Sequence, residues 1–152
     1  MKITTKGRYG LRAIINLASS YYNRPVSIKT IAKEEDISPE FLEQIFFRLK
    51  KAGIIESLRG PGGGFMLKQK PSEISIKDIF VALEESTSIT PCAVEDCTKS
   101  CKRENHCMVT NVWKELSEQI NDYLSKVTIK SILEDNGKKF YEDLSKEHNF
   151  SI

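Results

Sequence analysis

Apolar residues recur every three or four positions along residues 5–51, and this periodicity predicts three short helices in succession. The first helix is expected to begin after Thr4 or Thr5 and to end before Pro25, because proline disfavours a helical conformation in the residue that precedes it. Ser27 is a favourable N-cap for the second helix, and Ser38, with the proline that follows it, for the third.

A tight turn is predicted between the second and third helices. Asp36 tolerates the left-handed backbone conformation that such a turn needs, and Ile37 supplies an apolar side chain inside it. With Ala32 before the turn and Leu42 and Ile45 after it, the chain has the small residue and the core residues of a helix-turn-helix. This spacing favours DNA binding by the third helix.

The third helix has an apolar and a polar face. At about 100° per residue, Leu42, Ile45, Phe46 and Leu49 share the inner face. The opposite face carries side chains that can reach base edges or phosphates, with Glu43 at its margin; these are Glu40, Glu43, Gln44, Phe47, Arg48 and Lys51. Glutamine can pair with adenine and glutamate can accept from cytosine, so this face is the candidate major-groove reader.

A hairpin is predicted directly after the third helix. The segment I-I-E-S-L-R-G-P-G-G-G-F-M-L places apolar β-formers on both sides of a Gly/Pro cluster. In this position a hairpin is a wing, and Arg59 at its base can enter a narrow minor groove. Gly60, Pro61 and Gly62 complete the expected contact set of the wing. No Lys-Ser/Thr pair follows the glycines, which argues against a phosphate-binding loop for nucleotides.

The second half predicts two further helices. One starts at Ser75 and turns Ile79, Phe80 and Leu83 toward the winged domain. The other runs from Met108 to Lys126 with a long apolar stripe. The C-terminal half of the chain has little hydrophobic core of its own that could cover such a stripe. A homodimer interface is therefore expected, formed by Val109, Val112, Leu116, Ile120 and Tyr123.

The predicted fold class is therefore mostly α with a small β wing. It comprises a winged helix-turn-helix domain (1–70), a connecting helix with a cysteine-rich loop (71–107), and a long dimerisation helix with a C-terminal tail (108–152). Composition agrees with a globular chain, since 39% of its 152 residues are hydrophobic and 29% are charged. Without an apolar run of roughly 18 residues or a signal-peptide core, no membrane partner is expected and the predicted location is cytoplasmic.

Charge separates the two halves of the chain. Residues 1–70 carry 13 Lys/Arg and 6 Asp/Glu, a net charge of +7, whereas residues 71–152 carry 10 and 15, a net charge of −5. A basic half joined to an acidic half fits a domain that binds double-stranded DNA and a C-terminal part with a different task.

All four cysteines lie in one short stretch, at Cys92, Cys97, Cys101 and Cys107. In a cytosolic protein, clustered thiols indicate metal or redox chemistry before disulfides. Their C-x4-C, C-x3-C and C-x5-C spacings only partly follow the paired knuckles of structural zinc sites. As soft ligands, the thiolates suit zinc and an iron–sulfur cluster about equally. His106 adjoins Cys107 and is interpreted as a solvated loop residue.

The chain resembles the IscR-like iron–sulfur transcription regulators, within the wider BadM/Rrf-type winged-helix group. The matching segments are K-G-R-Y near the start, F-L-E-Q in the third helix, S-L-R-G-P-G-G-G-F-M-L in the wing, and the cysteine loop that runs into C-M-V-T-N-V-W-K-E-L. The resemblance implies a homodimeric repressor or activator on a pseudo-palindromic operator, with Glu43 and Gln44 reading bases and Arg59 in the minor groove. It also implies that cluster state alters operator binding, in response to iron–sulfur supply, redox status or nitric oxide.

The cluster ligands depart from the family pattern. Thr110 occupies the position of the family's histidine, and threonine is a poor ligand. Cys92, Cys101 and Cys107 are therefore expected to ligate the cluster with Cys97 as the fourth ligand; [2Fe–2S] is favoured over [4Fe–4S], and zinc is the alternative metal. Arg8 stands where nitric-oxide-sensing relatives can use an acidic ligand.

Two alternative functions are also consistent with the sequence. Cysteine-metabolism repressors of the same group bind no cluster and respond through a partner enzyme, and zinc could instead stabilise a winged-helix repressor. The targets expected for the cluster-bound form are cluster-assembly or sulfur-metabolism genes. An enzyme is not expected, because no catalytic constellation is apparent and the two histidines are isolated.

Overall fold

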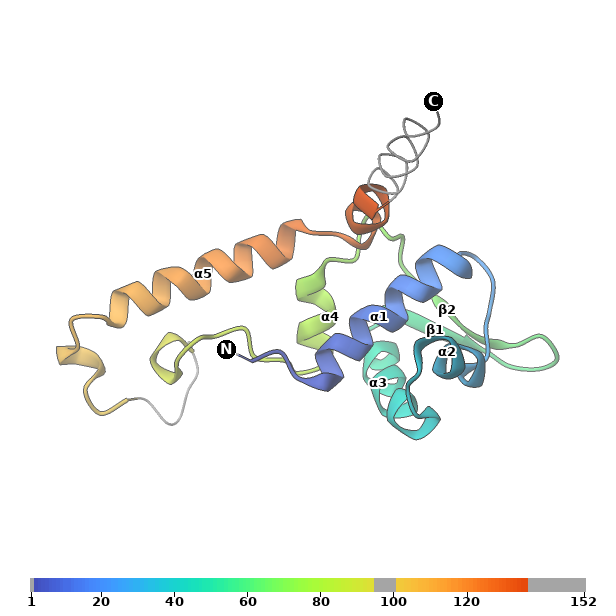
Figure 1. Cartoon of the computed structure of the whole chain (residues 1–152), viewed down its shortest axis with the longest axis horizontal. Helices are drawn as coiled ribbons and strands as arrows, with labels where there is room; N and C mark the ends of the chain where they lie inside the picture. Colours follow the sequence, from blue (N-terminus) through green and yellow to red (C-terminus); the bar gives the residue numbers. More distant parts are fainter. Residues whose placement is uncertain (1, 95–100, 137–152) are drawn as a thin grey trace, which may run out of the picture.

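The computed structural model of the chain describes residues 2–94 and 101–136. Its helices are α1 (Thr5–Ser20), α2 (Ile28–Glu35), α3 (Pro39–Lys51), α4 (Ile76–Ala82) and α5 (Thr110–Lys126), with short 3-10 turns η1 (Pro91–Ala93) and η2 (Glu104–His106). Strands β1 (Ile55–Leu58) and β2 (Gly64–Leu67) form an antiparallel hairpin, and residues 129–136 are helical. In Figure 1, α1 to α4 and the hairpin form one body, and α5 extends away from it.

Hydroxyl side chains begin the first three helices, as the sequence predicts. The hydroxyls of Thr4, Ser27 and Ser38 each accept a hydrogen bond from the amide three residues later, at 3.3, 3.2 and 3.2 Å. Asp36 ends α2 in the left-handed conformation, with φ 52° and ψ 51°. Ile37 is buried beside it, so the helix-turn-helix geometry is confirmed.

One hydrophobic core joins α1, α2, α3 and α4. Phe46 of α3 is fully buried, and its ring meets the edge of Phe65 on β2 with ring centroids 5.0 Å apart. In the hairpin, Ile55 pairs with Leu67 and Leu58 with Gly64. The wing is thereby fixed to the end of the helix that precedes it.

The C-terminal part is tied to the same core. Ser75 and Asp78 form a capping box at the start of α4, and an isolated bridge joins Ser75 to Thr128. Leu124 and Ile129 are buried in the core. Part of the apolar stripe of α5 is therefore covered within the protomer, where the sequence led us to expect little intramolecular burial.

α5 begins later than the apolar pattern suggests. Its first residue is Thr110 rather than Met108, whose side chain is 98% exposed. Val109 provides no side-chain cap, whereas Thr110 is buried and its hydroxyl donates to the carbonyl of Glu104 at 3.2 Å. In the part of the chain that the structure describes, no helix is long and apolar enough to cross a membrane.

Candidate DNA-binding face and cysteine segment

The outward face of α3 presents the side chains expected to meet DNA. Glu40, Glu43, Gln44 and Lys51 are exposed, while the residues of the inner face are buried. Phe47 is 70% exposed on the same outward face. Arg48 differs from its neighbours, because its guanidinium forms an ion pair with the carboxylate of Glu84.

The wing projects a tight exposed turn. Gly60 and Gly62 have φ values of 97° and 75°, which an L side chain rarely adopts. The Gly63 amide closes the turn on the Gly60 carbonyl at 2.9 Å. Arg59 and Pro61 are exposed beside them. Because β1 ends at Leu58 and β2 begins at Gly64, Arg59 lies in the turn of the hairpin rather than at its base, and this turn projects from the body of the protein (Figure 1).

A hydrogen bond joins the wing to the candidate reading helix. The ammonium of Lys50, in the last turn of α3, donates to the Ser57 hydroxyl on β1 at 2.6 Å. This contact ties the C-terminal end of α3 to the first strand of the wing.

Residues 84–90, here called the connecting segment, join α4 to the cysteines. At one end, Glu84 is paired with Arg48 of α3. The carboxylate of Glu85 accepts from the hydroxyl of Thr4 at 2.7 Å and from its amide at 3.3 Å. A Cβ added to Gly7 would lie 2.4 Å from the Glu85 carboxylate, so glycine leaves the space this contact needs.

The other end of the connecting segment is bound to α5. The Thr87 hydroxyl donates to the side-chain carbonyl of Asn121 at 2.8 Å. The Ile89 amide donates to the hydroxyl of Ser117 at 3.3 Å, and Ser117 is buried. The segment thus contacts the N-terminus of α1, the candidate reading helix and the long helix within seven residues.

The described cysteines differ in their surroundings. Cys92 lies in η1, is half-buried, and has its sulfur 3.1 Å from the Thr90 hydroxyl oxygen. Cys101 and Cys107 are exposed. Within residues 2–94 and 101–136, no three side chains of the ligating kinds come together as a metal site. Cys97 lies outside the described residues, so the four-thiol ligand set stays a prediction.

The Cys107 thiol lies at the start of α5. Hydrogen bonding from the Val109 backbone, with a smaller contribution from the Thr110 backbone, lowers the pKa of this thiol, and the charge of Arg103 acts in the same direction. Both effects favour the thiolate, which is the metal-binding form. Thr110 is buried and bonded to the Glu104 carbonyl, so it has a structural role at the position where the resemblance led us to expect a histidine ligand.

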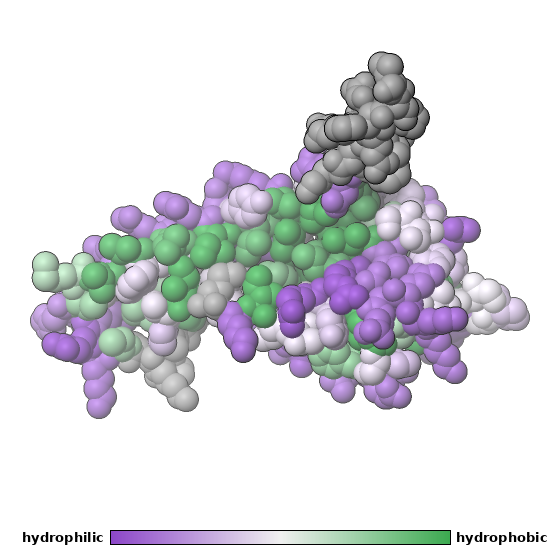
Figure 2. Space-filling model, in the orientation of Figure 1, coloured by the Kyte–Doolittle hydropathy of each residue, from purple (hydrophilic) through white to green (hydrophobic). Residues whose placement is uncertain are grey.

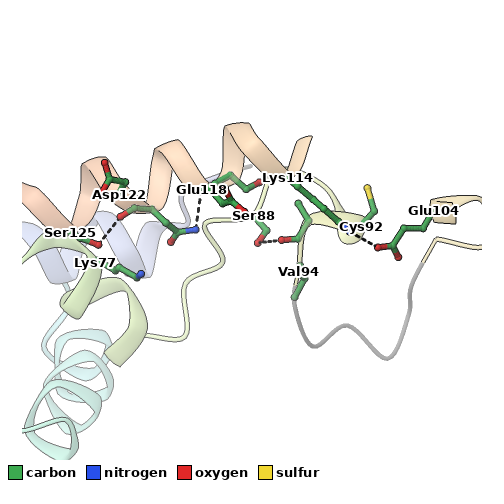
Figure 3. A pocket seen from close by; sticks show the side chains of 12 residues that line it. Lys77, Ser88, Cys92, Val94, Glu104, Lys114, Glu118, Asp122 and Ser125 are labelled. Carbon is green, nitrogen blue, oxygen red and sulfur yellow. Dashed lines mark hydrogen bonds and ion pairs between the residues drawn. The ribbon is translucent and has the colours of Figure 1, made fainter. Parts of the chain in front are cut away.

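An open groove of about 870 Å³ lies beside Cys92, between η1 and α5 (Figure 3). Lys114 and Glu104 form an ion pair at 2.9 Å on its wall. The hydrogen bond that the Lys114 ammonium donates to Glu104, together with the charge of that carboxylate, raises the pKa of Lys114. Sequence reasoning missed this pair, because nothing in the spacing of residues ten apart across an irregular loop indicates contact.

The exposed apolar residues of α5 lie on the side turned to solvent, as the green band along this helix shows (Figure 2). Val112 is 53% exposed and Tyr123 is 66% exposed; Val109 and Leu116 are also exposed. Ile120 is half-buried and packs against the protomer's core. Four of the five predicted interface residues are thus exposed in the protomer, whereas Ile120 already packs against the protomer's own core.

Comparison with known proteins gives consistent matches over most of the chain. The model of the Rrf2 family, described as iron-dependent transcriptional regulators, matches residues 3–135. A transcriptional regulator of the helix-turn-helix type from Neisseria meningitidis is 38% identical over 134 residues, which are 88% of each chain. Such relatives are regulators of transcription rather than enzymes.

Two solved structures have similar folds. The IscR of T. potens superposes with a TM-score of 0.70 and 31% identity, covering 90% of this chain and 88% of that one. The global cysteine regulator CymR of B. subtilis superposes with a TM-score of 0.68 and 32% identity, covering 87% of this chain and 95% of that one. The winged-helix body and the long helix are therefore shared with both kinds of regulator.

Proposed function

The chain belongs to the Rrf2 family of transcriptional regulators, and from this premise we propose that it is a homodimer whose operator affinity depends on an iron–sulfur cluster held by its own cysteines. One observation carries the proposal. The connecting segment begins at Glu84, which is ion-paired with Arg48 of the candidate reading helix, is bonded to α5, and leads directly to Cys92. Changes at the cysteines thus have a continuous physical route to α3.

In this function, different residues of α3 and the wing contact the bases, the minor groove and the phosphates. Gln44 and Glu43 read base edges in the major groove from exposed positions on α3. Arg59 enters a narrow minor groove from the wing, where the negative potential is enhanced. Lys51 and the backbone of Gly60 to Gly62 approach phosphates, which adds affinity but no sequence information.

The exposed stripe of α5 supports the dimer. Val109, Val112, Leu116 and Tyr123 would stay in water in a monomer, at a cost of roughly 25 cal/mol for each Å² of apolar surface. A second copy of α5 on this stripe would relieve the cost. Two-fold symmetry would then present two reading helices to the two halves of a pseudo-palindromic site.

The donor chemistry of the cysteine segment fits an iron–sulfur cluster. Cysteine sulfur is the usual ligand of such clusters, and the thiolate of Cys107 is stabilised by its surroundings. Cys92, Cys101 and Cys107, with Cys97 as the fourth ligand, would hold it; [2Fe–2S] is favoured over [4Fe–4S]. When bound, the group supplies a centre that responds to oxidants and nitric oxide.

The chain's own residues transmit the ligand state. Cys92 is two residues from Thr90 and three from Ile89, whose amide is bonded to Ser117 on α5. A change in the position of Cys92 would therefore displace the connecting segment, and Glu84 at the other end of this segment is ion-paired with Arg48. DNA affinity changes only as far as ligation favours the binding-competent arrangement over the other.

The test uses anaerobically purified full-length protein and four single Cys→Ala variants. Iron and sulfide are measured in each, and operator affinity is compared before and after cluster removal. We expect iron and sulfide to be lost in the Cys92, Cys101 and Cys107 variants and also in Cys97→Ala, and DNA affinity to change on cluster removal. Retained cluster in Cys97→Ala would remove only the fourth-ligand assignment. Full iron loading in Cys107→Ala, or equal affinity with and without the cluster, would overturn the sensing function.

A second candidate follows from the similarity to CymR, which is named as a cysteine regulator. In this alternative the chain is a cluster-free cysteine-metabolism repressor that responds through a partner enzyme. The same metal analysis separates the candidates: iron with sulfide indicates the cluster regulator, zinc a structural site, and neither metal the partner-controlled repressor.

A further inference from the structure

Phe47 is an exposed aromatic side chain on a helix whose other large apolar residues are covered. It is 70% exposed, whereas Phe46 beside it and Leu49 one half-turn later are fully buried. Phe41, the remaining phenylalanine of α3, packs its ring against Tyr9 with ring centroids 5.9 Å apart. The Phe47 ring is therefore not part of the hydrophobic core of the protomer.

Its position is the centre of the outward face. At about 100° per residue, Phe47 lies within roughly 60° of Glu40, Glu43, Gln44 and Lys51 around the helix axis. The buried residues Leu42, Ile45 and Leu49 lie on the opposite side of α3. Any partner that meets the polar side chains of this face also meets the ring.

Double-stranded DNA fits a polar helix face that carries one central aromatic ring, because its major groove contains an apolar group that the ring can contact. Each A·T pair presents the C5-methyl of thymine there, and phenylalanine is one of the side chains suited to contact it. Gln44 lies three residues before Phe47, about 4.5 Å along the helix axis, which exceeds the rise of roughly 3.4 Å between neighbouring base pairs by about a third. The ring can therefore reach a base next to the one that Gln44 reads.

We infer that Phe47 is a specificity-determining residue that contacts a thymine methyl group in each operator half-site. The inference rests on the proposed DNA-binding function and adds a base preference that the polar side chains do not supply. Loss of the ring removes a contact with DNA while leaving the folded protomer intact, since the side chain has little burial to lose.

The experiment begins with operators selected from a random duplex pool by the wild-type holoprotein. Each thymine of a selected operator is then replaced in turn by deoxyuridine, which removes only the methyl group. Wild-type protein should lose affinity by about fourfold per half-site at one thymine position, as expected for one buried methyl. Phe47→Ala should bind the original operator more weakly and be indifferent to deoxyuridine at that position.

Tyr22→Ala is the matched control, since it removes an exposed aromatic side chain outside α3. It should keep the wild-type response to deoxyuridine, and all three proteins should have the same thermal unfolding midpoint. Equal sensitivity of wild type and Phe47→Ala at every thymine overturns the inference alone. A change of oligomeric state in Phe47→Ala also overturns it, because the ring would then be a protein contact. Absence of any selected operator overturns the proposed function as well.

Discussion

Arg48, on the candidate reading helix α3, is ion-paired with Glu84, which lies two residues beyond the end of α4. Glu84 makes this contact from a backbone with φ 55°, a conformation in which glycine would be less strained. The pair therefore holds one basic side chain of the reading face against the segment that leads to the cysteines.

Glu84→Gln should release Arg48 toward the phosphate backbone. An exposed pair contributes only about 0–1 kcal/mol, so the free energy of unfolding should change little. Non-specific DNA affinity should rise, and the slope of log affinity against log salt should become steeper by about 0.9 for the added phosphate contact. Fluorescence anisotropy with labelled duplex over a salt series measures both.

Glu134→Gln is the control for this variant. It neutralises a carboxylate of an exposed ion pair with Lys130, remote in sequence from α3. It should leave the salt slope unchanged. If Glu84→Gln behaves in the same way, Arg48 is not held back from DNA by Glu84.

Gly7→Ala tests the anchor of the connecting segment at α1. Alanine in a helix is favoured over glycine by roughly 0.5–1 kcal/mol, but here its Cβ would lie 2.4 Å from the Glu85 carboxylate. We expect no gain in stability in the wild-type background. In a Glu85→Ala background the obstacle is gone, and Gly7→Ala should then stabilise the protein by about that amount. Urea unfolding of the four proteins measures the difference, and equal effects in both backgrounds would contradict the assignment.

Arg59→Ala and Gln44→Ala should affect DNA binding in different ways. Loss of Arg59 should weaken binding most at operators with a narrow minor groove. Loss of Gln44 should relax the preference at one base position by about 1–3 kcal/mol. Binding measured against operators altered at single positions separates the two effects. Unchanged binding by both variants at every operator would remove these roles.

Local signals in the sequence were sufficient for the winged-helix half. Hydroxyl caps at Thr4, Ser27 and Ser38 and the turn at Asp36 act over a few residues, and each was confirmed. The contacts of Glu84 with Arg48 and of Glu85 with Thr4 span 36 and 81 residues. No periodicity or motif encodes such distant pairs, which form only once α4 has packed on α1 and α3.

The same distinction holds for the cysteine segment and α5. Clustered thiols indicated ligand chemistry, but the ion pair of Lys114 with Glu104 depends on how an irregular loop folds back on a helix. Helical spacing predicts a single apolar surface on α5, yet Leu124 and part of Ile120 are covered within the protomer. Periodicity identifies an apolar face without saying which chain covers it.

Leu116→Glu with Val112→Glu should disrupt the proposed dimer. Both side chains are exposed in the protomer and lie on the uncovered stripe of α5. Burying two unpaired carboxylates from each copy between the two protomers would cost several kcal/mol, so association should be lost while each protomer stays folded. Ile120 is left unchanged, because its contact with the core would confuse loss of folding with loss of association. Sedimentation velocity gives the oligomeric state, and circular dichroism the helix content.

Ser125→Glu is the control for the proposed dimer interface on α5. It adds a carboxylate at an exposed position about 220° around the helix axis from Val112. This variant should sediment as the wild type does. Since each monomer carries one reading helix, the double variant should also lose the cooperative occupation of two half-sites, leaving weak binding to either one. A folded double variant that still sediments as a dimer would show that another surface joins the protomers, and the spacing of the two reading helices would have to be sought there.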